Sequence, residues 1–127
     1  MKGIYHLTVS GMFDAAHYLK NYKGKCANLH GHTWKVEMEV SFDKLNSIGI
    51  SMDFKDLKSI LQDELNRFDH KELNKFFGEE NPTAENIAKF IYGIIKNAGK
   101  VKLEAIRVWE TPNCCVEYKE VKDVKGE

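Results

Sequence analysis

The sequence lacks the features that mark several large classes of protein. It carries no net charge, because 19 Lys and Arg residues balance 19 Asp and Glu residues, so no excess positive field is available to hold a nucleic-acid backbone. No apolar run approaches the roughly 18 residues that span a bilayer, and the start MKGIYHLTVS lacks the basic and apolar regions of a signal peptide. We therefore expect neither nucleic acid nor membrane as a partner, and we predict a cytoplasmic location.

Cysteine and linker-like stretches are also scarce. The three cysteines make an odd count, and Cys114 and Cys115 are neighbours that regular structure does not easily bridge. A disulfide framework is not expected. The 43% apolar and 30% charged composition is that of an ordinary globular protein, and 127 residues without a repeat or a Pro/Ser-rich linker are close to the usual size of one domain. We predict a single domain over residues 1–127.

Hydrophobic periodicity predicts two strand pairs around two helices. Residues 33–42 alternate strictly between apolar and polar side chains, which predicts a half-buried strand. Further strands are expected at residues 5–9, 101–110 and 114–118, the last two as a hairpin, and amphipathic helices at 53–68 and 83–99. The order ββααββ predicts an α+β fold, an antiparallel sheet with both helices on one face. Its apolar strand face is expected to need more cover than two helices give, which predicts an oligomer.

Three histidines are placed to meet at one end of this sheet. His30 and His32 are two apart at the entry to the alternating strand, so both point to the face that carries Trp34. His17 lies just past the first strand, and an antiparallel hairpin would bring it beside them. Three imidazoles and a water form a common catalytic zinc site, in which the open position polarises a substrate oxygen. The alternative for each histidine taken singly is an ordinary core or surface residue.

Cys26 and the pair Asp69-His70 are the candidates for proton transfer. Cys26 precedes His30 by four residues, and a thiol near a zinc ion or an imidazolium is shifted toward the thiolate, which acts as a base or nucleophile. The alternative is a small buried apolar residue. Asp69-His70 follows the first predicted helix and would supply an imidazole oriented by a carboxylate, or else it is only a polar helix end.

Two further residues are candidates for holding a substrate. Glu110 ends a predicted strand, where its carboxylate could accept two hydrogen bonds from an amidine-like edge of a ligand; the alternative is a solvated strand end. Thr83 is equally well placed to cap the second helix. Neither residue identifies a function alone.

Six motifs together resemble the family of 6-pyruvoyl-tetrahydropterin and 6-carboxy-tetrahydropterin synthases over nearly the whole chain. They are FDAAH at 13–17, CANLHGH at 26–32, SMDFKDLK at 51–58, FDH at 68–70, NPTAENIA at 81–88 and VWET at 108–111. The resemblance implies the tunnelling fold, in which ββααββ subunits join their sheets into a barrel, as a trimer or a dimer of trimers. It also implies the residue roles, which are zinc ligation by His17, His30 and His32, a catalytic thiol at Cys26 with Asp69 and His70 from another subunit, and a pterin anchor at Glu110 and Thr83.

The three residues between Cys26 and the HGH motif resemble the 6-carboxy branch of the family, in the queuosine pathway, rather than the 6-pyruvoyl branch. That branch converts 7,8-dihydroneopterin triphosphate to 6-carboxy-5,6,7,8-tetrahydropterin with release of acetaldehyde and triphosphate. Tyr18 departs from the family, because many relatives have an arginine there, and no triphosphate-binding residue is assigned. The alternatives are a 6-pyruvoyl synthase, an enzyme acting on a related dihydropterin, or a non-catalytic zinc-binding protein of this fold.

Overall fold

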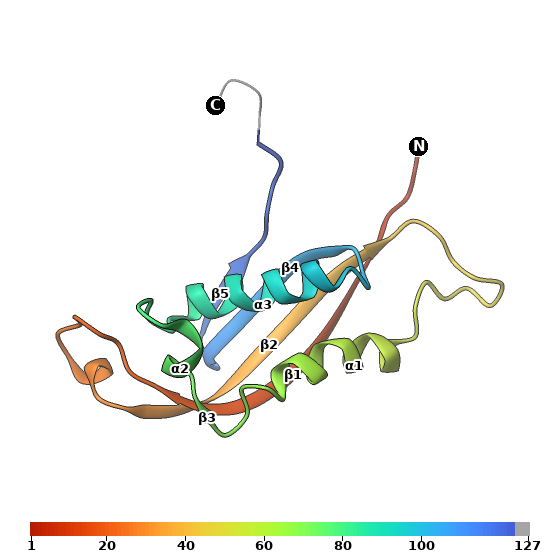
Figure 1. Cartoon of the computed structure of the whole chain (residues 1–127). Coiled ribbons are helices and arrows are strands. Elements are labelled where there is room, and N and C mark those ends of the chain that lie inside the picture. Colours follow the sequence, from red (N-terminus) through yellow and green to blue (C-terminus); the bar gives the residue numbers. More distant parts are fainter. Residues whose placement is uncertain (124–127) are drawn as a thin grey trace.

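The protein is built on one five-stranded sheet, seen in a computed structural model that describes residues 1–123. The strands are β1 (Tyr5–His17), β2 (His30–Phe42), β3 (Lys71–Glu72), β4 (Leu103–Thr111) and β5 (Cys114–Tyr118). Their order in the sheet is β3-β1-β2-β4-β5, and all neighbours are antiparallel except β3, which runs parallel to β1. Helices α1 (Phe54–Leu65) and α3 (Ala84–Ala98) lie on the same face of the sheet (Figure 1).

The predicted α+β architecture is confirmed, and two short elements between the two predicted helices were missed. These are β3 and the helix α2 (Asn74–Phe77), which lie between α1 and α3 in the chain. Both lie at the same end of the sheet as the connection from β1 to β2 (Figure 1). Elements of two and four residues have too little sequence to show a period, and tertiary hydrogen bonds such as Leu73 N–H to the Ala16 carbonyl hold them in place.

The first strand is longer than its sequence indicated. β1 pairs with β2 without interruption from Tyr5 opposite Phe42 to His17 opposite His30. Most residues after Val9 are small or polar, and the large apolar ones, Met12 and Phe13, are neighbours, so no alternation is visible. A Cβ atom at Gly11 would lie 2.5 Å from the Gln62 side-chain oxygen and 2.9 Å from Cδ1 of Leu65, so a larger residue would displace these side chains. The glycine therefore lets α1 approach the strand closely.

The central part of the sheet face beneath the helices is buried within one chain. Its central side chains on β2 have no exposed surface; they are Trp34, Val36, Met38 and Val40. They pack in one core with the buried leucines of α1 and the buried isoleucines of α3. The segment after α1 adds buried Phe68 and Leu73 to the same core. These four side chains therefore need no second chain to cover them, contrary to the argument from which an oligomer was expected.

Both long helices begin at the capping residues that the sequence indicated. The Asp53 carboxylate accepts a hydrogen bond from the Lys55 amide, and the Thr83 hydroxyl oxygen accepts one from the Asn86 amide. Gly99 ends α3 in the left-handed conformation. The hairpin of β4 and β5 is also confirmed.

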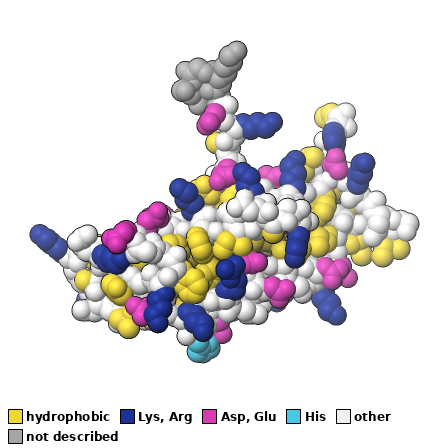
Figure 2. Space-filling view, in the orientation of Figure 1, with side chains coloured by type: hydrophobic (Ala, Val, Ile, Leu, Met, Phe, Trp, Pro, Cys, Tyr) yellow, Lys and Arg dark blue, Asp and Glu magenta, His cyan; other side chains and the backbone are white. Residues whose placement is uncertain are grey.

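The outer surface of the helices is polar and of mixed charge. Figure 2 shows basic and acidic side chains interspersed over this side of the molecule, with apolar side chains between them, in keeping with the balanced composition. Within residues 1–123, no helix has the length and hydropathy needed to cross a membrane.

Candidate metal centre

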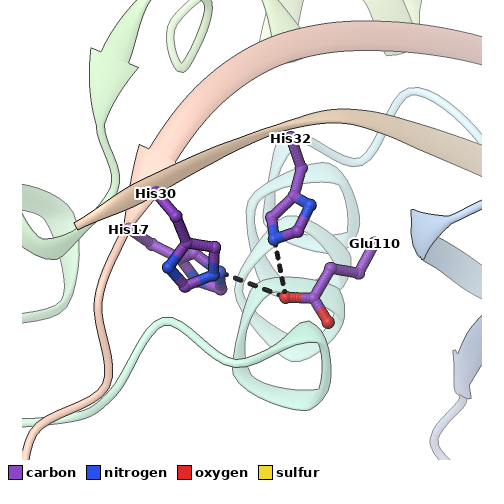
Figure 3. Close-up of side chains that lie close together, drawn as sticks. All are labelled: His17, His30, His32 and Glu110. Atoms are coloured by element: carbon purple, nitrogen blue, oxygen red, sulfur yellow. Dashed lines mark ion pairs between the residues drawn. The ribbon is translucent and has the colours of Figure 1, made fainter. Parts of the chain in front are cut away.

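Three histidines and one glutamate meet at one end of the sheet, on the face that carries the helices. His17 is the last residue of β1 and lies opposite His30, the first residue of β2. His32 follows two positions along β2 and shares the face of His30, while Glu110 lies near the end of β4. One ligand atom from each of the four lies within 4.8 Å of the others (Figure 3). The structure thus brings together the three histidines that the sequence selected, and adds a carboxylate.

Hydrogen bonds determine which ring nitrogen of His17 and of His30 remains free. Nδ1 of His17 lies 2.7 Å from the Pro82 carbonyl oxygen, and Nδ1 of His30 lies 2.7 Å from the Asn28 carbonyl oxygen. A carbonyl oxygen only accepts, so both Nδ1 atoms carry the hydrogen, and each neutral ring keeps a lone pair on Nε2. This arrangement is usual behind a histidine that ligates a metal.

One ring nitrogen of His17 and one of His32 face the Glu110 carboxylate. Among residues 1–123, Nε2 of His17 and Nε2 of His32 are buried without a hydrogen-bond partner. The Glu110 Oε1 atom lies 3.1 Å from the first and 3.2 Å from the second. A lone pair and a carboxylate oxygen this close repel one another unless a proton or a cation lies between them. Ligand atoms around a tetrahedral zinc with bonds of roughly 2.1 Å are about 3.4 Å apart, so the spacing fits a metal ion.

The electrostatics of His32 favour its neutral form. Burial lowers the pKa of His32 below its ordinary value of 6.5; Glu110 opposes this shift, and the neighbouring rings of His17 and His30 add to it. A neutral ring at pH 7 is the form that binds a metal. The four residues can therefore hold a metal ion.

Glu110 was predicted from the sequence as a contact for a ligand ring, and not as a neighbour of the three histidines. It lies two residues after Val108, which is fully buried beneath the helices, so strand alternation turns Glu110 to the same face. The register of β4 on β2, with Trp109 opposite Lys35, brings it level with the histidines. The alternation is visible in the sequence, but the register is set by long-range packing and is not.

Cys26 lies outside the group of four. It is half-buried in a 3-10 turn, η1 (Lys25–Ala27), within the connection from β1 to β2. Its carbonyl oxygen accepts a hydrogen bond of 2.7 Å from the Leu19 amide, which ties the turn back to the chain that follows His17. The structure therefore places the thiol on the loop that joins two of the predicted ligands.

Asp69 and His70 are anchored to the edge of β1. The Asp69 carboxylate accepts hydrogen bonds of 2.8 Å from the Asp14 amide and 2.8 Å from Nδ1 of His70, and these two bonds hold its pKa below the ordinary value. The His70 amide donates to the Asp14 carbonyl oxygen, and the residue has a positive φ of 59°. The imidazole is largely exposed, and it borders the same open hollow as His32 and Thr33.

The Thr83 hydroxyl oxygen is occupied in capping α3. Its neighbour Pro82 supplies the carbonyl oxygen that orients His17. The start of α3 thus supports the site through its backbone, a function that the sequence did not indicate.

The fold and this group define a small α+β protein with a candidate metal centre at one end of its sheet. The chain belongs to the 6-pyruvoyl tetrahydropterin synthase family, whose model matches residues 6–121. It is 39% identical over 132 aligned residues to the 6-carboxy-5,6,7,8-tetrahydropterin synthase of Haemophilus influenzae, an alignment that covers 85% of this chain and 94% of the relative.

Two further similarities bear on fold and activity. The chain is 39% identical over 100 residues to a dihydroneopterin monophosphate aldolase of Pyrococcus furiosus, covering 77% of this chain and 82% of that protein. The structure of Caenorhabditis elegans 6-pyruvoyl tetrahydropterin synthase superposes with a TM-score of 0.81 at 26% identity, over 94% of this chain and 98% of that one. The predicted tunnelling-fold subunit is confirmed.

Proposed function

We propose that the chain is a zinc-dependent 6-carboxy-5,6,7,8-tetrahydropterin synthase. It would convert 7,8-dihydroneopterin triphosphate to the 6-carboxy product, with release of acetaldehyde and triphosphate. No external redox cofactor is required, because the ring is reduced at the expense of its side chain. The similarity to the Haemophilus enzyme over 94% of that protein supports this assignment.

The observation that carries the proposal is the opposition of two buried histidine nitrogens and a carboxylate oxygen at 3.1 and 3.2 Å. His17, His30 and His32 would hold the ion through Nε2, and three imidazoles suit zinc as a borderline-soft cation. A zinc ion bound there supplies a Lewis acid that makes the side-chain hydroxyls and the neighbouring C–H bonds of the substrate more acidic.

Proton transfer is assigned to Cys26 and the Asp69-His70 pair. The Asp69 carboxylate accepts from Nδ1 of His70, so the Nε2 atom of a neutral His70 keeps a lone pair that can take a proton from the substrate. Asp69 is itself fixed by the Asp14 amide, which limits how far the imidazole turns. The Cys26 thiolate would act as the second base.

Glu110 is assigned to the pterin ring, together with Thr83. Of the three histidines, His32 borders a hollow together with Trp109 and Glu110, and a ring held there by the Glu110 carboxylate would lie next to the metal. Two hydrogen bonds from the amidine-like edge of the ring to one carboxylate would fix its orientation. Thr83 would contribute its hydroxyl hydrogen, since its oxygen already accepts from Asn86.

The direct test is to incubate the zinc-loaded protein with 7,8-dihydroneopterin triphosphate and to identify the product by mass. We expect the 6-carboxy compound and acetaldehyde. A 6-pyruvoyl product would assign the other branch of the family. The absence of turnover of both this compound and the corresponding monophosphate, with full zinc occupancy, would favour a non-catalytic zinc protein.

A second candidate follows from the Pyrococcus relative, which is as similar in identity as the Haemophilus enzyme but covers less of both chains. That protein is a dihydroneopterin monophosphate aldolase, so the chain would cleave the side chain of the monophosphate. Parallel incubations with monophosphate and triphosphate at equal concentration separate the two, because only one should be turned over efficiently.

The setting of the enzyme is proposed from the family resemblance. We propose a cytoplasmic homo-oligomer, a trimer or a dimer of trimers, in which residues 1–127 form one domain and contribute to queuosine biosynthesis. Light scattering of the purified protein measures its mass directly, and a monomer would contradict this proposal.

A further inference from the structure

Two asparagine side chains grip the backbone directly after His17. The Asn74 side-chain oxygen accepts from the Tyr18 amide at 3.0 Å, and its Nδ2 atom donates to the Tyr18 carbonyl oxygen at 3.0 Å. Asn81 does the same to Lys20, at 2.7 Å and 2.9 Å. Each amide thus satisfies both polar groups of one residue, as a neighbouring strand would. We call Asn74 and Asn81 the asparagine clamp.

The clamp acts on one side of the chain and the turn of Cys26 on the other. Tyr18 and Lys20 are two apart and bond to the clamp, while the intervening Leu19 amide donates to the Cys26 carbonyl oxygen at 2.7 Å. This alternation of directions is that of an extended chain. The position of the Cys26 backbone therefore depends on a segment whose other edge is held by two side chains.

The supports of the clamp are themselves fixed. Asn74 is 8% exposed, and the preceding Leu73 amide donates to the Ala16 carbonyl oxygen of β1. The Asn81 carbonyl oxygen accepts from Nδ2 of Asn86, one turn into α3. Because the two asparagine side chains are themselves held in place, they can fix the position of the backbone to which they bond.

The segment of Asn81 and Pro82 also orients one residue of the candidate metal centre. Pro82, next to Asn81, accepts the hydrogen bond from Nδ1 of His17. The start of α3 therefore touches both the first ligand strand and the loop that carries Cys26. A shift of this segment would move the thiol and the His17 ring together.

We infer that Asn74 and Asn81 are positioning residues that set where the Cys26 thiol stands relative to the histidine centre. They act through the backbone of residues 18–20 and contact no reacting atom. The inference rests on the proposed function only in giving Cys26 a part in catalysis. The mechanical coupling of the clamp to Cys26 is independent of the substrate, so it can be tested without one.

The variant that tests this is Asn81→Asp, which keeps the oxygen that accepts from Lys20 but replaces the amide donor with a second acceptor facing the Lys20 carbonyl. The background carries Cys114→Ser and Cys115→Ser, so that Cys26 is the only thiol. The matched control is Asn97→Asp, an exposed position on α3. Zinc content and unfolding temperature are measured for each protein.

The first readout is the alkylation rate of Cys26 by iodoacetamide as a function of pH. We expect Asn81→Asp to change the alkylation rate at one or more pH values by about 5-fold or more. Its zinc content should stay at the level of the control. Steady-state kinetics should then show a fall in kcat of about 10- to 100-fold with little change in KM. Alkylation and kcat both equal to those of the control would overturn the inference.

A second measurement needs no variant and serves if Asn81→Asp does not fold. Hydrogen exchange of the wild-type protein, read by NMR, should show the amides of residues 18 and 20 protected like those of β1. Fast exchange at both amides would mean that the clamp is not closed in solution, and the inference would fall. If no pterin is turned over by the wild-type protein, the proposed function fails while the alkylation and exchange results still decide the clamp.

Discussion

The two faces of the sheet both gather carboxylates around nitrogen-bearing side chains, but they satisfy these groups differently. On the open face, the Arg107 guanidinium lies 2.6 Å from Glu39, 2.9 Å from Glu117 and 3.6 Å from Glu37. Glu39 also accepts from Nδ1 of His6 at 2.9 Å. Every one of these contacts joins a donor to an acceptor, so the cluster is complete within the chain.

On the face covered by the helices, Glu110 instead faces a ring nitrogen of each of two histidines. Nε2 of His17 and Nε2 of His32 are buried and have no hydrogen-bond partner within residues 1–123. Leaving such atoms unsatisfied costs about 1–3 kcal/mol each, a cost that a bound cation removes. Both clusters contain charged side chains, so charge does not distinguish them. The comparison teaches that a binding site is marked by buried polar atoms that lack a hydrogen-bond partner.

The strongest test of this difference between the two faces is to remove one of the histidines proposed to bind the metal. His30→Ala and His32→Ala should each reduce zinc affinity by more than the roughly 10- to 100-fold typical of changes behind a ligand, and abolish turnover. Atomic absorption after dialysis against a weak chelator measures the first effect. His70→Ala is the control, since it removes an exposed imidazole outside the group of four; full zinc occupancy in His30→Ala and His32→Ala would refute the ligand set.

The next largest effect is expected at Cys26. Cys26→Ala should retain zinc and the folded structure but lower kcat by about 10²- to 10⁴-fold, because the thiol is assigned to proton transfer and not to ligation. Cys114→Ala on the exposed hairpin should leave kcat unchanged. Near-normal turnover by Cys26→Ala would remove the thiol from the mechanism.

Glu110→Gln sharpens the comparison, because it keeps the shape of the side chain and removes its charge. Binding of a pterin product should weaken about 10- to 100-fold, in line with the 1.5–3 kcal/mol of a hydrogen bond to a charged group. Zinc should remain, held by the three histidines. Titration calorimetry that found product binding unchanged would show that Glu110 serves the metal centre alone.

Features of the fold and the site could be predicted from the sequence where they depend on residues close together in the chain. Helix periods and the capping residues Asp53 and Thr83 are local, and the structure has the two long helices and their caps where they were predicted. The pairing of His17 with His30 followed from one hairpin. Glu110 could not be placed in the group, because its position depends on the register of β4 on β2, which no local pattern encodes.

The clamp residues escaped sequence analysis for a related reason. Asn74 and Asn81 are ordinary polar residues in their own segments, and their partners lie 56 and 61 positions away in the sequence. Arg107 was likewise invisible as the centre of a cluster, since its carboxylates come from β2 and β5. The contacts at these positions are created only when the chain folds.

On the open face, Arg107→Met should lower stability without touching the site. It leaves the facing carboxylates together without their cation, at a cost of about 1–3 kcal/mol for partly buried charges. The hydrogen bond from Arg107 is the main cause that lowers the pKa of Glu39 from 4.5. A carboxyl whose folded-state pKa is lowered stabilises the protein above its unfolded pKa, and this contribution is lost as pH falls through the folded value. Denaturant unfolding at pH 7 and near pH 3 should therefore show the gap between wild type and variant narrowing in acid.

The smallest effect is expected at His6, which makes the closest matched test of the two faces. Like His17, it lies on β1 within reach of a glutamate, but its Nδ1 atom already has a partner in Glu39 and its side chain is 52% exposed. Exposed pairs of this kind contribute little, so His6→Ala should change the free energy of unfolding by less than about 0.5 kcal/mol. Zinc content and kcat should equal those of the wild type, because the pair lies on the open face. A loss of zinc in His6→Ala comparable to that in His32→Ala would show that a histidine with a satisfied partner can matter as much as one without, and the distinction between the two faces would fail.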